Sequence, residues 1–229
     1  MSRRLAARAV CTVALALCTA VQAAPFAVQL GLDRLVVDTP PGFTDSGSFG
    51  SPRLTEIAEN LAEASSRVLA FALADADARK FAVGDSLDLR RYLLAVTPRA
   101  TERDRMTAAQ FAALVQTAGR GLGPAPDAKL VADLRAYLKE RAPQQAHLIA
   151  DFKREPQLLS VMQGTMIPQP GRWIDGPPLF KVSSMTLVLV GGKAVYLSAF
   201  SAYDGPADAE WVRTVAERWV EDLRRLNSR

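Results

Sequence analysis

The sequence is poor in the side chains that build most metal and redox sites: its 229 residues include two cysteines and one histidine. Both cysteines, Cys11 and Cys18, precede position 24. A domain that begins after them has no thiol, so thiolate metal sites, cysteine nucleophiles and disulfides are excluded there. Its stability has to come from burial of a hydrophobic core. A zinc ion would have only His147 beside carboxylates, so we expect no metal and no cofactor.

Long hydrophobic runs are also scarce, and the most apolar one lies at the N-terminus. Arginines at positions 3, 4 and 8 precede an apolar run over residues 10–20, and Val21-Gln22-Ala23 has the small residues of a cleavage site. The run is shorter than the roughly 20 residues that a membrane span needs. Residues 1–23 are therefore predicted to be a secretory signal peptide. We expect a periplasmic or secreted protein that starts at Ala24 and has no stable membrane span; an uncleaved N-terminal anchor is the alternative.

Little net charge remains outside this segment. The formal net charge of the chain is +4, from 28 basic and 24 acidic residues. The three N-terminal arginines account for most of it, and no acidic residue precedes position 24, so residues 24–229 carry about +1. Such a balance predicts no nucleic-acid partner.

Residues 24–229 are long enough for a single domain with its own core. Apolar and β-branched runs predict strands over residues 34–39, 67–74, 90–97, 158–167, 180–190 and 193–203. Helical spacing predicts helices over 53–65, 107–118 and 207–226. A further helix is expected to begin near Asp127, break at Pro143 and restart toward Phe152. Residues 75–89 are charged and irregular, with room for one helical turn.

The C-terminal third carries the clearest pattern. Gly191-Gly192 between two β-rich runs is typical of a tight hairpin, because glycine accepts a positive φ. Farther on, Trp211, Trp219 and Leu223 share one face of a helix. Consecutive apolar residues in both hairpin strands indicate a sheet covered on both faces. We predict an α+β fold, with a mainly antiparallel sheet flanked by helices and a C-terminal β-hairpin followed by a long amphipathic helix.

The two ends of this domain resemble a known group of proteins. An early strand runs into Pro41-Gly42-Phe43 and is followed by a loop and a helix. Near the end, paired strands over 185–190 and 194–203 lead to a tryptophan-bearing helix. This order resembles the exported α/β sandwich group that includes PsbP, Mog1 and DcrB-like proteins. The resemblance implies an α/β sandwich in an accessory or binding protein, and it brings no catalytic residues with it.

No catalytic set of residues stands out in the sequence. A cluster of aspartates could bind calcium, but its spacing does not match an EF-hand, and a solvated loop is the favoured interpretation: Asp75, Asp77, Asp85 and Asp88. Glu102 and Asp104 could pair as acid and base, but the arginines around them indicate ion-paired surface. His147 has no evident nucleophile or orienting acid, so a surface histidine is expected.

The best candidate for recognition is the loop over residues 168–178. An aromatic side chain on a proline-stiffened loop loses little conformational entropy on binding, which favours Trp173 and its neighbour Arg172 as binding residues. A core position for Trp173 is the alternative. Phe43, in the Pro40–Phe43 turn, is the third predicted binding residue.

These patterns lead to a functional prediction. We expect a non-enzymatic binding or accessory protein of the bacterial cell envelope, whose partner is an envelope protein or a small ligand. One alternative is a hydrolase that uses carboxylates such as Asp75, Asp77, Glu102 or Asp104. The other is a small-ligand carrier, which would need a cavity between sheet and helices.

Overall fold

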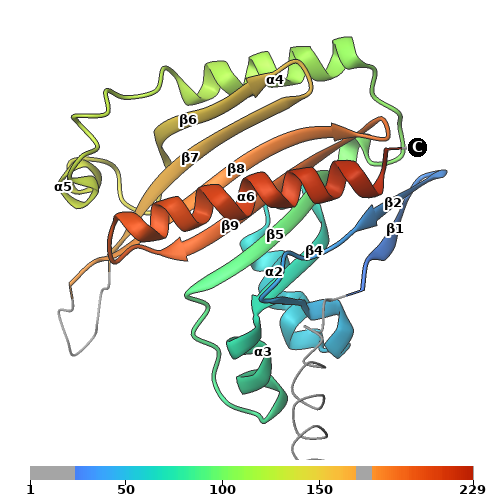
Figure 1. The fold of residues 1–229 in the computed structure, drawn as a ribbon, viewed down its shortest axis with the longest axis horizontal. Coiled ribbons are helices and arrows are strands. Elements are labelled where there is room, and N and C mark those ends of the chain that lie inside the picture. The colour runs from blue at the N-terminus through green and yellow to red at the C-terminus, as the bar shows by residue number, and fades with distance from the viewer. Residues whose placement is uncertain (1–23, 169–176, 229) are drawn as a thin grey trace, which may run out of the picture.

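The predicted α+β class is confirmed. The computed structural model describes residues 24–168 and 177–228, and its main element is a seven-stranded antiparallel sheet in the order β3-β4-β5-β9-β8-β7-β6 (Figure 1). Its strands are β3 (Phe43–Asp45), β4 (Ser66–Ala74), β5 (Arg91–Pro98), β6 (His147–Glu155), β7 (Leu158–Ile167), β8 (Leu179–Val190) and β9 (Lys193–Ala202). A separate hairpin joins β1 (Phe26–Leu30) to β2 (Asp33–Val37). The helices are α2 (Pro52–Leu61), α3 (Asp75–Ala82), α4 (Ala108–Leu122), α5 (Leu134–Lys139) and α6 (Pro206–Leu226), with 3-10 turns at Ser46–Phe49 and Arg99–Thr101.

The predicted C-terminal hairpin forms the centre of the sheet. Gly191 and Gly192 connect β8 to β9 with φ values of +58° and +79°, which a two-residue hairpin with positive φ at both positions requires. β8 continues on its other side into β7, and β9 into β5. The middle strands are therefore hydrogen-bonded on both sides.

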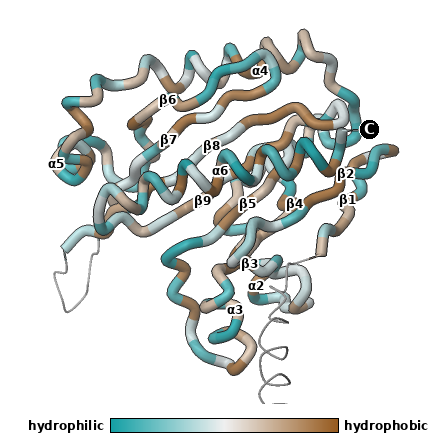
Figure 2. The backbone as a smooth tube through the Cα atoms, viewed as in Figure 1, coloured by the Kyte–Doolittle hydropathy of each residue, from teal (hydrophilic) through white to brown (hydrophobic). Residues whose placement is uncertain are grey.

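One face of the sheet, called here the α6 face, is covered along its length by α6. Figure 1 shows α6 lying across β8 and β9, and Figure 2 shows hydrophilic and hydrophobic residues alternating along it. Val212, Trp219 and Leu223 are buried on the sheet, and the Trp219 indole N–H donates to the carbonyl oxygen of Asp38 over 2.7 Å. Trp211 is only partly buried, and its ring centroid lies 5.9 Å from that of Phe43. The expected core role of the helix is confirmed.

The opposite face is covered in two separate places. α2 and α3 pack over β4 and β5 through Leu54, Ala58 and Ala78. α4 packs over β7 and β8, with Phe111 fully buried. Its first turn has a capping box, in which Thr107 and Gln110 satisfy each other's backbone N–H groups. We call this side of the sheet the groove face.

Four expectations about local structure are wrong. Residues 26–30 form a strand, β1, where no element was expected, and residues 75–82 form the full helix α3. Asp127 caps a turn, accepting from the Lys129 N–H, and the helix beyond it is the short α5, capped by Asp133. The segment after Pro143 is the edge strand β6, not a restarted helix, because two bulges break the alternation of its apolar residues.

Among the described residues, none of the helices combines the length and apolarity that crossing a membrane requires.

Three chain segments are joined by one buried lysine. The side chain of Lys193, at the start of β9, is 1% exposed, and its Nζ lies 3.2 Å from a carboxylate oxygen of Asp33. The same ammonium donates to the carbonyl oxygens of Glu102 and Asp104, over 3.0 and 2.8 Å. Arg105 is also paired with Asp33 at 2.9 Å. The β1–β2 hairpin and the loop after β5 are thereby anchored to the central hairpin.

We predict that Lys193→Met lowers the free energy of unfolding by about 3 kcal/mol, because it leaves buried acceptors without their donor. Denaturation in urea at pH 7 measures the change. The control is Lys153→Met in β6, whose ion pair with Glu155 is 46% and 40% exposed and whose loss should stay within about 0.5 kcal/mol. Equal effects of the two variants would contradict the anchoring role of Lys193.

The start of α6 is held by a charged network. The half-buried carboxylate of Asp208 accepts from the N–H groups of Asp204 and Gly205, over 2.8 and 3.2 Å, and pairs with Arg91 at 2.9 Å. Burial alone would raise the pKa of Asp208. The hydrogen bonds and the arginine outweigh burial and lower that pKa below its ordinary value.

The lowered pKa of Asp208 predicts a pH dependence of its own. Its stabilisation is complete above the unfolded-state pKa of about 4 and disappears as the pH falls through the lower folded-state pKa. We expect Asp208→Asn to lose about 1 kcal/mol at pH 7, because the neutral amide accepts weaker hydrogen bonds. Unfolding in urea at pH 7, 5 and 3 should show the gap to wild type closing at the acid end. A gap that stays constant with pH would be inconsistent with this assignment.

Candidate functional site

The groove face has a cavity where its covering helices do not meet. It lies between the C-terminal end of α2 and the side of α4, with strands β5, β7, β8 and β9 as its floor, and its volume is about 660 Å³. Its lining residues are Leu61, Ala62, Glu63, Ser65, Ser66, Leu94, Val96, Pro98, Leu114, Ala118, Gly121, Leu122, Ala146, Gln163, Thr165, Ser183, Ser184, Met185, Tyr196, Ser198 and Phe200. We call this cavity the groove.

The floor of the groove is set by strand register. Gln163 on β7 pairs with Ser183 on β8, which pairs with Phe200 on β9. One step along the strands, Ser198 on β9 pairs with Leu94 on β5. Since side chains alternate across a strand, residues two apart along each strand point to the same face. The floor is therefore a set of adjacent rows that mix hydroxyl, amide, aromatic and aliphatic side chains.

The wall formed by α4 consists of apolar residues, some of which have small side chains. Leu114, Ala118, Gly121 and Leu122 recur at helical spacing and line the groove along one side of the helix. Two of the four are small, so the helix leaves open space above the floor. Leu114 and Leu122 are only partly buried, and they offer apolar surface to an occupant.

The hydrogen bonding of polar side chains differs between the two faces of the sheet. On the α6 face they are bonded to one another: Ser160 to Thr186 at 2.6 Å, and Ser184 Oγ to the Ala199 N–H at 3.0 Å. On the groove floor, the side chains of Gln163, Ser183 and Ser198 make no hydrogen bond to another described residue, and neither do those of Thr165 and Tyr196. None of these polar atoms is completely buried, so water can satisfy them in the free protein and a ligand can take the place of that water.

Electrostatics at the groove follow from its partial burial. Burial, with the nearby charge of Glu63, raises the pKa of Tyr196. Burial also raises the pKa of Tyr92, whose ring stacks on Phe200, to about 12. Both phenols stay protonated at neutral pH and can donate hydrogen bonds.

The predicted binding residues do not form this groove. Arg172 and Trp173 lie outside the described residues, and their binding role stays a prediction. Phe43 is 7% exposed, with its ring against Trp211 in the main core. One edge of Phe43 also lines a second cavity of about 660 Å³, with Phe26, Leu69 and Asp75 among its other residues. Ala24, the first described residue, also lines that cavity.

The candidate carboxylates are not brought together. Asp75 begins α3, directly after β4, and accepts from the Thr44 hydroxyl at 2.8 Å; Asp77 is buried in the same helix. Glu102 and Asp104 follow β5, whose Pro98 pairs with Ser66 at the start of β4. Asp75 and Asp77 thus lie at one end of β4, and Glu102 and Asp104 lie near its other end. At about 3.3 Å per residue, the nine residues of β4 separate the first pair from the second by about 26 Å.

His147 begins β6, and its Nε2 lies 2.9 Å from the carbonyl oxygen of Ala142. It makes a local contact, as the interpretation of a surface histidine expects. Across residues 24–168 and 177–228, side chains of metal-binding type form no group of three or more.

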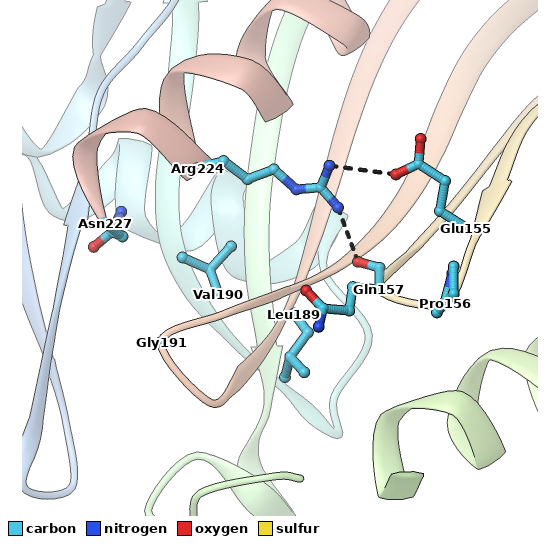
Figure 3. A pocket seen from close by; sticks show the side chains of 8 residues that line it. All are labelled: Glu155, Pro156, Gln157, Leu189, Val190, Gly191, Arg224 and Asn227. Atoms are coloured by element: carbon cyan, nitrogen blue, oxygen red, sulfur yellow. Dashed lines mark hydrogen bonds and ion pairs between the residues drawn. The ribbon is translucent and has the colours of Figure 1, made fainter. Parts of the chain in front are cut away.

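A third cavity, of about 540 Å³, lies at the C-terminal end of α6 and is lined by an ion pair between Arg224 and Glu155 (Figure 3). Arg224 reaches Glu155 at 3.5 Å and donates to the carbonyl oxygen of Gln157 over 3.3 Å. The guanidinium is therefore engaged within the protein. Among the cavities described, the groove combines apolar walls with unpaired polar groups, and we regard it as the candidate site.

The sequence alone does not mark the open face of the central strands. Ser183 and Ser198 lie on the groove face of two strands that are otherwise rich in apolar residues. Ser184 and Thr186, however, lie on the covered face of the same strand β8, where both are bonded. A hydroxyl in a central strand is therefore compatible with either face, and the packing of the helices decides which face is open.

Two adjacent serines test the contrast between the faces. Ser183 and Ser184 are 7% and 1% exposed, and their side chains point to opposite faces, so only the backbone of Ser184 borders the groove. We predict that Ser184→Ala lowers the free energy of unfolding by about 1–2 kcal/mol, because the Ala199 N–H loses its acceptor. Ser183→Ala should change it by less than about 0.5 kcal/mol. Urea denaturation of both variants measures the difference, and equal losses would mean that Ser183 is also bonded.

Comparison with known proteins leaves the function to be argued from the groove. No protein-family model matches the chain, and a search of curated proteins finds no match to it. The resemblance to PsbP, Mog1 and DcrB-like proteins stays a prediction.

Proposed function

We propose that the protein is an exported, non-enzymatic binding protein that holds a small amphipathic ligand in the groove between α2 and α4. The observation that supports this most directly is the pairing of apolar walls with a floor of unbonded polar side chains. A cavity between sheet and helices is what the small-ligand alternative required.

The size and lining of the groove suit a small molecule. Ligand pockets typically occupy about 300–1,000 Å³ and combine mainly apolar walls with a few placed polar groups. The groove, at about 660 Å³, lies within this range. Leu94, Val96 and Met185 offer apolar contact, and the hydroxyls of Ser183 and Ser198 offer hydrogen bonds that orient a ligand.

The floor also supports a preformed site. β8 and β9 are bonded to neighbours on both sides, and their α6 face is packed under α6. Central strands of this kind open rarely compared with loops. A ligand would therefore find its polar contacts already in place and lose less entropy on binding.

The export part of the proposal is supported by the first 23 residues, with their arginines, short apolar run and small-residue cleavage pattern. A cysteine-free domain at near-neutral net charge is compatible with an oxidising compartment. The ligand would then be one that is present outside the cytoplasm.

The proposal is tested by filling the groove. Ser198→Phe places a ring on the floor beside Met185 and Leu94 and should weaken binding of the fluorescent probe N-phenyl-1-naphthylamine by about tenfold or more. The matched control is Ser48→Phe, which puts the same ring on the exposed rim of the cavity beside Phe43. Fluorescence titration of the purified mature protein should show saturable binding to wild type and to Ser48→Phe.

A second groove variant keeps the test decisive if Ser198→Phe fails to fold. Ala118→Trp fills the space from the α4 wall, and thermal unfolding of every variant reports on the fold. Unaltered probe binding by folded Ser198→Phe and Ala118→Trp, or no saturable binding to wild type, would overturn the proposal.

A further inference from the structure

One lysine lies just beyond the residues that line the groove. Lys181 on β8 pairs with Thr165 on β7, which lines the groove, and it precedes Ser183 by two residues. It therefore projects from the same face of the sheet as the groove floor. Its ammonium lies 5.8 Å from the ring centroid of Tyr92, whose ring stacks on the groove residue Phe200 at 4.5 Å.

Among the described residues, Lys181 lacks the kind of partners that Lys193 has. Lys193 is buried with a carboxylate and two carbonyl oxygens around its ammonium. Within the described part of the chain, Lys181 makes neither a salt bridge nor a side-chain hydrogen bond, although it is partly buried. Burial lowers the pKa of Lys181. A partly desolvated ammonium without a counter-ion is stabilised by an anion that reaches it.

The other end of the groove carries the opposite charge. Glu63 lines the groove there, close enough to Tyr196 to influence its pKa. Tyr196 pairs with Leu187 on β8, and at about 3.3 Å per residue Lys181 and Leu187 are about 20 Å apart along that strand. Between the two ends the lining is mainly apolar, with Leu94, Val96 and Met185 among its residues.

We propose that the ligand of the groove is an anionic amphiphile, with a single carboxylate held at Lys181 and an alkyl chain that runs toward Tyr196. This inference rests on the proposed function. Charge complementarity fixes the direction, because Lys181 attracts the anionic head and Glu63 repels it. The apolar floor and the α4 wall then bury the chain.

Competition against N-phenyl-1-naphthylamine tests the proposal. Three ligands with the same chain and different heads are compared: dodecanoate, dodecanol and dodecyltrimethylammonium. In wild type, dodecanoate should displace the probe at about tenfold lower concentration than dodecanol, and dodecyltrimethylammonium should be the weakest. Lys181→Met keeps the apolar stem of the lysine and should abolish the preference for dodecanoate without weakening dodecanol.

Two further variants keep the outcome decisive. Lys181→Glu should reverse the order in favour of dodecyltrimethylammonium, and the control Lys153→Met, on the edge strand β6, should behave as wild type. A preference for dodecanoate that survives both Lys181→Met and Lys181→Glu overturns the inference, as does equal displacement by all three ligands in wild type. In either case, probe binding that is still blocked by Ser198→Phe leaves the proposed function standing. Loss of saturable probe binding to wild type would instead remove both.

Discussion

The structure depends on how the helices cover the two faces of a seven-stranded sheet. On one face a single helix, α6, crosses the central strands and buries Val212, Trp219 and Leu223. On the other face α2 and α4 each cover one side and leave the middle of the sheet open. Two short covering elements on a wide sheet need either a third helix between them or a floor that tolerates exposure. The floor supplied by β8 and β9 is of the second kind.

The polar side chains of the central strands follow from this difference in coverage. Under α6, where water is excluded, each hydroxyl named above is bonded, and Ser184 even takes part in the β8–β9 ladder through the Ala199 N–H. Facing the groove, Ser183 and Ser198 have no such requirement, because water or a ligand can reach them. The same residue type therefore has a structural role on one face and is available for recognition on the other. A hydroxyl counts as a candidate contact only when its face is known.

The sequence predicts the parts of this molecule whose signals are local. Gly191-Gly192 and the spacing of Trp211, Trp219 and Leu223 are local signals, so the sequence alone places the hairpin and α6. The prediction of a helix over β6 was wrong because two bulges, between Leu148 and Ala150 and between Asp151 and Lys153, interrupt the alternation of apolar residues that marks a strand. These bulges arise from pairing with β7, which the sequence of β6 alone does not show. The groove was missed for the same reason. Ser183 and Ser198 become neighbours only through the order of β8 and β9, and the open space above them depends on where α2 and α4 pack.

The floor and the wall of the groove should respond differently to an occupant. β5, β7, β8 and β9 are hydrogen-bonded to strands on both sides, so the positions of Gln163, Ser183 and Ser198 are held by the whole sheet. α4 has no such network of hydrogen bonds to neighbouring strands, and it is held by the packing of Phe111 and the apolar residues around it. A ligand on the floor would bury the exposed parts of Leu114 and Leu122 and so add to the contacts that hold α4. On the proposed function, the free energy of ligand binding would thus be coupled to the stability of one helix, and the sheet that orients the ligand would not have to change.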